Sequence, residues 1–222
     1  KIIGQLPKKR QSLMFSATMA DKIRKLANQI LNNPLEVSVA VSKPAEGVTQ
    51  EVYMAHEDQK NRMVKHLLKD KDLFQAILIF CSTKKKVEQL SRQLKRSNYN
   101  AEGISSDYAQ KEREETLAGF RSGRTRILVA TDVMSRGIDI KGIDLVINYD
   151  VPTDAEDYVH RIGRTARAGA DGIAISFCDH EERGYLRDIE KTIRQTVTVM
   201  EDHPYHAADV ATSTAKPPAP GG

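Results

Sequence analysis

The segment HRIGRTARAG, residues 160–169, concentrates basic side chains in a way that suggests anion binding. His160, Arg164 and Arg167 are spaced i, i+4 and i+7, so a continuous helix would carry all three on one face. An arginine side chain presents a planar fork of N–H donors that suits phosphate oxygens and stays charged at physiological pH. The segment therefore predicts a phosphate clamp, and the alternative is a solvated basic helix that stops at Gly169.

A second candidate site is the segment TDVMSRGIDI, residues 131–140, which directly follows the apolar run RILVA. In an open parallel sheet, ligands bind beyond the carboxyl ends of the strands, so this polar segment stands where a site is expected. Gly137 allows the backbone to approach a ligand closely, and the Asp139 carboxylate could accept hydrogen bonds from sugar hydroxyls. The other polar members of the segment are Thr131, Asp132 and Arg136. The alternative is a polar loop with an ordinary turn glycine.

The segment SSDYAQKERE, residues 105–114, has the pattern of a helix start. Asp107 could cap the helix, and Gln110, three residues later, would complete a capping box. Gln110 and Arg113 would then share a helix face near its N-terminus, where phosphate groups are stabilised.

The segment STKKK, residues 82–86, places Thr83 and three lysines, beginning with Lys84, after the strand-like run AILIFC. Lysines at a helix N-terminus oppose the helix macrodipole, so helix stability alone does not favour them there. They are interpreted either as a solvated surface or as contacts to phosphate groups.

Two other segments resemble ligand sites only superficially. GFRSGRT, residues 119–125, is one residue too short for a phosphate-binding loop, has Arg in place of Lys, and ends a helix pattern instead of starting one. DAED, residues 154–157, follows Pro152 and is typical of a helix N-terminus. Neither is expected to bind magnesium, and no metal site is predicted.

Strand and helix patterns alternate along the middle of the chain. The apolar runs are continuous, as expected of strands covered on both faces: 76–80, 126–131, 145–149 and 172–177. Amphipathic helix patterns lie at 59–70, 83–97, 110–121 and about 181–194. This alternation predicts an α/β domain with a mainly parallel central sheet.

The two ends of the chain differ from its middle. Residues 11–17 have a strand pattern, residues 20–31 a helix pattern, and residues 42–47 the composition of a linker. We therefore expect residues 1–41 to hold the last strand and helix of a preceding domain with the start of the linker, and residues 42–200 to form the main domain. Residues 201–222 lose periodicity and end in STAKPPAPGG, which predicts a disordered tail.

Composition sets wider limits on function. The 222 residues carry a net charge of +4, which is compatible with a polyanionic partner without proving one. Cys81 and Cys178 stand in or beside apolar runs, which predicts buried thiols in a reducing compartment such as the cytoplasm. No apolar run approaches the length of a membrane span, so no membrane contact is expected. Because the first residue is Lys1 and not Met, the chain is expected to be either a piece of a longer protein or a processed product.

Taken together and in order, the motifs resemble the C-terminal half of DEAD-box ATP-dependent RNA helicases of the bacterial type. The matching segments are SAT at 16–18, LIF at 78–80, Gln110 with Arg113, TDVMSRGIDI, VINYDVP from 147 onward, and HRIGRTAR. The resemblance covers roughly residues 11–195. It implies a RecA-like three-layer sandwich that forms the C-terminal lobe, preceded by the last strand and helix of the N-terminal lobe.

The resemblance assigns roles by position. Arg164 and Arg167 match the arginines that reach the γ-phosphate of ATP, and Asp139, with Gly137 beside it, matches the acid that contacts the nucleotide ribose. The residues that match couplings between the two lobes are Ser16, Thr18, Arg136 and His160. The matches to RNA-backbone contacts are Thr83, Lys84, Gln110, Arg113 and Thr131. The chain departs from the family pattern at Ser105 and Ser106, where His-Gly is frequent, and at Ala166, where Gly is frequent.

The same resemblance implies a mechanism and its partners. ATP and Mg²⁺ would be held mainly by the N-terminal RecA-like lobe of the same protein, and lobe closure would unwind short RNA duplexes. The chain alone lacks the phosphate-loop and Asp-Glu-Ala-Asp segments and should be inactive. Aromatic residues make up only 5% of the chain, so single-stranded or duplex RNA is expected to be bound through its backbone, independently of sequence, by a monomer.

Two other functions remain open from the sequence. A lone lobe could bind RNA or a protein regulator without turnover, and the absent nucleotide cradle agrees with that interpretation. A helicase of the same superfamily that acts on DNA is the second alternative, since a fold does not by itself select between substrates.

Overall fold

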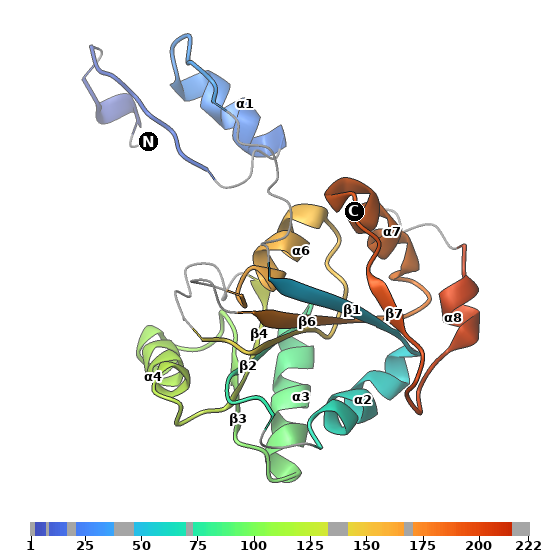
Figure 1. The fold of residues 1–222 in the computed structure, drawn as a ribbon. Helices are drawn as coiled ribbons and strands as arrows, with labels where there is room; N and C mark the ends of the chain where they lie inside the picture. Colours follow the sequence, from blue (N-terminus) through green and yellow to red (C-terminus); the bar gives the residue numbers. More distant parts are fainter. Residues whose placement is uncertain are drawn as a thin grey trace. The chain divides into compact units, whose positions relative to one another are not determined.

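The computed structural model describes residues 3–7, 9–16, 21–37, 47–69, 73–132, 142–166 and 171–214. The chain divides into two compact units, Lys1–Ala40 and Val41–Gly222 (Figure 1). The predicted linker at 42–47 lies outside the described residues except for Gly47.

The first unit contains a short 3₁₀ helix, η1 (Ile3–Gln5), and the helix α1 (Asp21–Ile30), which confirms the helix pattern at 20–31. The predicted strand at 11–17 was wrong over its described part, because residues 11–16 form no strand. A strand needs a neighbouring strand to satisfy its backbone N–H and C=O groups, and the described residues of this unit supply none. Apolar side chains here are exposed, among them Leu13 (72%), Phe15 (89%) and Leu35 (91%).

The second unit is built on a seven-stranded sheet with the order β3-β4-β2-β5-β6-β1-β7, and every strand pair in it is parallel. The strands are β1 (Val48–Met54), β2 (Ile77–Phe80), β3 (Ala101–Ile104), β4 (Ile127–Ala130), β5 (Leu145–Asn148), β6 (Gly172–Cys178) and β7 (Thr198–Met200). The predicted parallel sheet is confirmed. In β2, β4 and β5 every residue is buried, which explains why their sequences are apolar without alternation.

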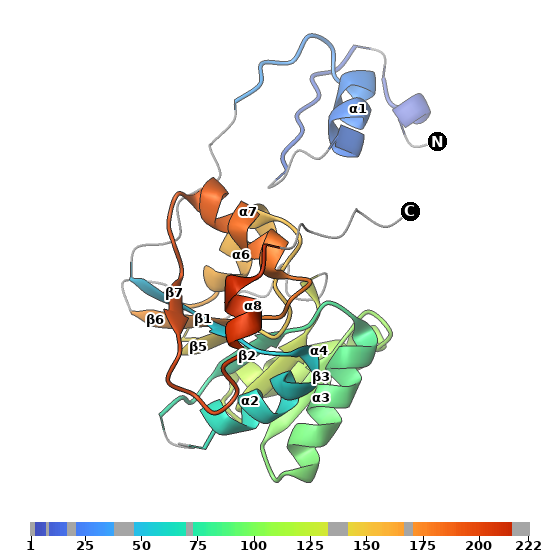
Figure 2. The same ribbon diagram turned by 90° about the vertical axis from the view of Figure 1, so that its right-hand side faces the viewer.

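Helices cover both faces of this sheet, which gives the predicted three layers (Figure 2). The helical elements are η2 (Glu57–Gln59), α2 (Lys60–Leu67), α3 (Lys84–Arg96), α4 (Gln110–Arg121), α6 (Ala155–Ile162), α7 (Arg183–Ile193) and α8 (Ala208–Thr212). Alternate strand residues face opposite layers. Ile77 and Ile79 pack with α2 and α3, whereas Leu78 and Phe80 pack with Phe120 of α4.

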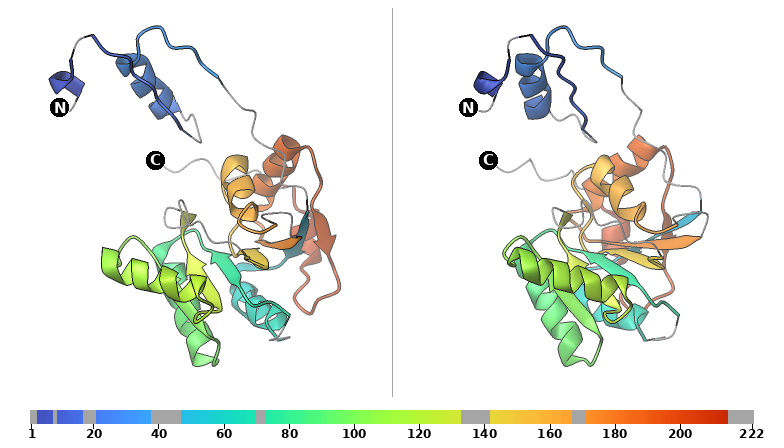
Figure 3. Two further views of the ribbon diagram at one scale, coloured as in Figure 1. Left: turned by 60° about the vertical axis from the view of Figure 1, so that its left-hand side comes forward. Right: turned by 90° about the vertical axis from the view of Figure 1, so that its left-hand side faces the viewer.

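The remaining part of the second face is covered by α6 and α7, and α8 joins them against β1 and β6 (Figure 3). Tyr158, Leu186 and Val210, one from each helix, are fully buried in this cluster. None of the helices in the described parts of the chain is long and apolar enough to cross a membrane.

The C-terminal segment differs from the prediction of a disordered tail from residue 201. Residues 201–214 are described and fold back on the sheet, where the Ala207 N–H donates to the Met54 carbonyl at 2.9 Å. Ala207 and Val210 are buried. The buried residues of this segment are too few to produce a helical or strand period in the sequence. Only the tertiary structure therefore reveals that the segment is ordered. Residues 215–222, with the Pro-rich end, lie outside the described residues.

Candidate nucleic-acid and nucleotide interface

The carboxyl edge of the sheet brings together most of the predicted site residues that the structure describes. Since the strands are parallel, the segments that follow them emerge at this one edge. We divide the edge into two halves. The β3–β4–β2 half comprises residues 82–86, 105–113 and 131–132, and the β5–β6–β1 half comprises residues 55–60, 149–154 and 178–182.

In the β3–β4–β2 half, α3 begins as the STKKK segment predicts. The Thr83 hydroxyl accepts a hydrogen bond from the Lys86 backbone N–H at 3.2 Å and caps the helix. Lys84 forms an ion pair with Asp107, and the two side chains are 51% and 68% exposed. Lys84 therefore remains accessible to a ligand from solvent.

The predicted cap at Asp107 was wrong. Helix α4 begins at Gln110 with Ala109 as its N-cap, and the Ala109 N–H donates to the Glu112 carboxylate at 3.1 Å. The chain first turns after β3, where the Tyr108 N–H donates to the Ser105 carbonyl at 3.3 Å, and this turn delays the helix. Asp107 is left to pair with Lys84.

Gln110 and Arg113 lie on the first turn of α4, three residues apart and hence on one face. The Gln110 amide donates to Glu114 at 2.6 Å. The Arg113 Nε is buried and has no hydrogen-bond partner among the described residues. A buried N–H without an acceptor is costly, and a bound anion would supply the acceptor.

The single helical face predicted for HRIGRTAR was wrong. Helix α6 ends at Ile162 with Gly163 as its C-cap, and Ala166 has a positive φ of 50°. His160 lies in the last turn of α6, whereas Arg164 lies beyond the helix, where its Nε donates to the His160 carbonyl at 3.2 Å.

The turn after α6 is fixed by contacts with two other segments. The Thr165 hydroxyl donates to the Ile143 carbonyl at 2.6 Å, and a Cβ at Gly172 would lie only 2.0 Å from that hydroxyl oxygen. Only glycine therefore fits at Gly172 with this turn in place. These tertiary contacts compete with continuation of the helix and hold Arg164 half-buried at the end of α6.

Arg161 is a buried positioning residue that the sequence analysis missed. It is 3% exposed, and its Nε and Nη2 donate to the two Asp132 carboxylate oxygens at 2.6 and 2.7 Å. Its Nη1 donates to the Asp150 carbonyl at 2.8 Å. The sequence could have indicated this role, because Arg161 lies with Tyr158 and Ile162 on the apolar face of α6. A cation on such a face is buried and needs an anionic partner.

The β5–β6–β1 half is organised around Lys60, which is fully buried. Its Nζ lies 2.7 Å from Glu182, 3.0 Å from Asp179, 2.9 Å from Glu57 and 3.7 Å from Asp150. Glu182 also accepts hydrogen bonds from the Val151 and Asp179 backbone N–H groups. This network ties together the segments after β1, β5 and β6.

The charges of this network shift the pKa values of its members. Burial acts to lower the pKa of Lys60, but the four surrounding carboxylates outweigh burial and raise it well above its ordinary value. Burial acts to raise the pKa of Asp150, but Lys60, Lys86 and the Ser82 N–H lower it overall. Burial raises the pKa of Glu182 to about 7.

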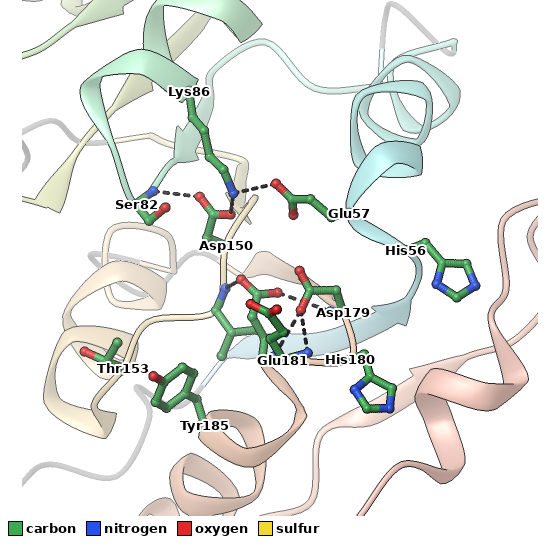
Figure 4. Close-up of a pocket in the computed structure, with 12 residues that line it drawn as sticks. His56, Glu57, Ser82, Lys86, Asp150, Thr153, Asp179, His180, Glu181 and Tyr185 are labelled. Carbon is green, nitrogen blue, oxygen red and sulfur yellow. Dashed lines mark hydrogen bonds and ion pairs between the residues drawn. The ribbon is translucent and has the colours of Figure 1, made fainter. Parts of the chain in front are cut away.

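An open pocket of about 530 Å³ lies over this network, and Figure 4 shows Lys86 reaching between Asp150 and Glu57 at one side of it. His56 and His180 line the other side. No group of three or more His, Cys, Asp or Glu side chains in the described ranges could hold a metal ion. Glu57, Asp150, Asp179 and Glu182 form ion pairs with Lys60 or Lys86, so these four carboxylates belong to a structural charge network.

The comparison with protein families agrees with this geometry. Residues 59–169, half of the chain, match the family described as the helicase conserved C-terminal domain. The chain belongs to this family.

The relatives of this helicase domain include DEAD-box proteins. It is 45% identical over 199 residues to "DEAD-box ATP-dependent RNA helicase 40" of Oryza sativa and covers 25% of that protein, with 87% of this chain aligned. It is 39% identical over 201 residues to "ATP-dependent RNA helicase CshA" of Listeria monocytogenes and covers 38% of it, with 90% of this chain aligned. The chain thus spans well under half of these two relatives.

Among solved structures, the helicase domain is similar to S. cerevisiae Dbp5 bound to RNA and ADP BeF3. The TM-score is 0.78 at 32% identity, and the match covers 90% of this chain and 53% of that one. The fold is therefore the RecA-like α/β fold of DEAD-box C-terminal domains.

The structure thus places part of the predicted site. Thr83, Lys84, Gln110, Arg113 and Thr131 all belong to the β3–β4–β2 half of the helicase domain. Ser16 lies in the first unit, before α1, and its side chain is exposed. The predicted residues that lie outside the described ones are Thr18, Arg136, Gly137, Asp139 and Arg167.

Proposed function

We propose that this domain is the C-terminal lobe of an ATP-dependent RNA helicase that unwinds short RNA duplexes by ATP-driven closure of two lobes. The observation that carries the proposal is the ion pair of the buried Arg161 side chain with Asp132. It joins the segment after β4, which holds Thr131, to α6, which holds His160 and leads to Arg164. This ion pair therefore connects the segment of a proposed RNA contact, Thr131, with the helix that leads to a proposed nucleotide contact, Arg164.

RNA is bound through its backbone along the β3–β4–β2 half. The proposed contacts are Thr83, Lys84, Gln110, Arg113 and Thr131. Their common edge, the exposure of Lys84 and the unpaired Nε of Arg113 support this role. Contacts to phosphates and sugars carry no sequence information, so binding is sequence-independent and falls steeply with salt. The RNA-bound state of the similar Dbp5 structure agrees with the proposal.

Arg164 and Arg167 donate hydrogen bonds to the γ-phosphate when the lobes close. ATP, held together with Mg²⁺ mainly by the N-terminal lobe, supplies the free energy for closure. Gly137 and Asp139 contact the ribose, and the residues that couple the lobes are Ser16, Thr18, Arg136 and His160. The planar guanidinium group of Arg164, which is half-buried at the end of α6, suits a phosphate. The contact between Arg164 and the γ-phosphate forms only when the lobes close over a bound nucleotide, so ATP favours the closed state.

The N-terminal RecA-like lobe is the proposed partner of the first unit. Leu13, Phe15, Leu35 and Val37 are 72–91% exposed there, as expected of apolar side chains that a further part of the same domain covers. The complete protein would work as a monomer in the cytoplasm. The buried free thiols of Cys81 and Cys178 support a reducing compartment.

The test is Arg164→Ala in the complete protein. RNA-stimulated ATP turnover should fall by about 10³- to 10⁵-fold while RNA affinity changes little, because the arginine acts on the transferring phosphoryl group. Arg24→Ala is the control, since Arg24 lies on α1 and pairs with Glu36 in an exposed ion pair. An equal loss of turnover and RNA affinity in Arg164→Ala would contradict the proposed role.

The isolated chain separates the remaining alternatives. It should show no ATP turnover alone and RNA-stimulated turnover once combined with the N-terminal lobe. RNA binding without turnover after reconstitution would favour a non-catalytic binding lobe. Stimulation by single-stranded DNA as strong as that by RNA would favour a DNA-directed helicase.

A further inference from the structure

We propose that Tyr108 is a stacking site for one base of single-stranded RNA. The inference rests on the RNA-binding role proposed above for the β3–β4–β2 half. Tyr108 stands in the turn after β3, two residues before the start of α4, and is 37% exposed. None of the RNA contacts named so far involves a base.

Tyr108 differs from the other aromatic residues of the second unit. All seven tyrosines and five phenylalanines of the chain lie in described segments, and Tyr108 is the exposed aromatic residue of this unit. The others are buried or partly buried, for example in the pairs of Phe177 with Tyr53 and Tyr149. A single exposed ring needs no ligand to explain it, so the argument depends on where this ring stands.

Tyr108 lines two open hollows of the surface. One hollow, of about 600 Å³, is lined by Tyr108 together with Lys84, Lys85 and Ser105. The other, of about 380 Å³, is lined by Tyr108 together with Thr116 and Gly119 of α4. A flat aromatic side chain that borders open space can accept another flat ring against its face.

Two lysines and three carboxylates line the first hollow, and the lysines supply the cations that a phosphate beside the ring would need. Lys84 is anchored by Asp107, the residue directly before Tyr108, and Lys85 lines the same hollow. The carboxylates there already have partners, since Glu88 pairs with Arg92 and Glu112 accepts the Ala109 N–H. A phosphate held by the lysines would place its own nucleotide next to Tyr108.

This combination of cations and one aromatic ring is typical of sequence-tolerant binding to single strands. Every base has a π-face, so Tyr108 would not read sequence. It would distinguish a strand that carries bases from a bare sugar–phosphate backbone, and an unpaired strand from a duplex whose bases are stacked.

The test measures binding of the 222-residue chain to a short oligouridylate and to the abasic ribose–phosphate oligomer of the same length. Tyr108→Ala should weaken oligouridylate binding by about 5- to 150-fold, the usual range for loss of one stacked base. Tyr108→Phe should bind like the wild type because it keeps the ring. Both variants should bind the abasic oligomer like the wild type.

Each other outcome is decisive. Unchanged oligouridylate binding by Tyr108→Ala, or equal weakening for both oligomers, overturns the stacking role while the backbone contacts stand. If Lys84→Ala and Arg113→Ala also leave binding unchanged, the proposed RNA-binding edge itself fails. A wild-type chain that binds neither oligomer overturns both proposals. Far-ultraviolet circular dichroism of each variant establishes that the fold is retained.

Discussion

Lys60 and Lys84 occupy the same edge of one sheet, yet their surroundings are opposite. In the β5–β6–β1 half, Lys60 is fully buried and contacts four carboxylates. In the β3–β4–β2 half, Lys84 pairs with Asp107, and both side chains are more than half exposed. The first half uses its charges to join strand ends, whereas the second leaves charge accessible to a ligand. The contrast teaches that a lysine after a strand does not by itself indicate a binding site.

The largest expected effect is that of Lys60→Met. Removing one partner of a buried charge network leaves carboxylates buried without compensation, so the free energy of unfolding should fall by about 3–5 kcal/mol. Urea denaturation measures this, and RNA affinity of the folded fraction should be unchanged. A loss below about 1 kcal/mol would show that water reaches the network and would break the contrast between the two halves.

A smaller effect, which depends on pH, is expected for Asp150→Asn. The folded-state pKa of Asp150 is lowered below 3.8, so its contribution to stability is present above that pH and is lost as pH falls through the folded value. The variant should therefore be about 1.5–3 kcal/mol less stable than the wild type at neutral pH, and this difference should shrink in acid. Denaturant unfolding across this pH range measures the difference.

Asp107→Asn is the matched control for that experiment. Its exposed pair with Lys84 contributes about 0–1 kcal/mol at most, so the variant should remain close to the wild type throughout the range. A pH-dependent loss as large as that of Asp150→Asn would mean that the two halves do not differ in this respect.

The smallest effect on stability is expected for Lys84→Met, which makes the same side-chain exchange as Lys60→Met in the other half. The free energy of unfolding should change by no more than about 0.5 kcal/mol because the ion pair is exposed. RNA affinity should fall, and the slope of log affinity against log salt should decrease by about 1 if Lys84 contacts one phosphate. A destabilisation comparable to that of Lys60→Met would remove the distinction between structural and ligand-directed lysines.

The strands β2, β4, β5 and β6 and most of the longer helices could be predicted because their signals are local. The fully buried strands β2, β4 and β5 read as continuous apolar runs, and α3 and α4 carried their apolar stripes within a residue or two of the observed bounds. The strands β1, β3 and β7 and the helix α8 were not predicted. In β7 and α8, three and five residues are too few to show a period. Their positions follow from contacts such as that of Ala207 with Met54.

The sequence by itself determined the fold class and the positions of the motifs. Strands buried on both faces and amphipathic helices each produce a pattern of apolar residues within a short stretch of the chain. Only the tertiary structure decided which charged side chains form ion pairs with one another. Arg161 and Asp132 are 29 residues apart in the chain, and Lys60 and Glu182 are 122 apart, so no local spacing reveals either pair. The end of α6 was decided in the same way, because Thr165 bonds to Ile143, a residue 22 positions away, in place of continuing the helix.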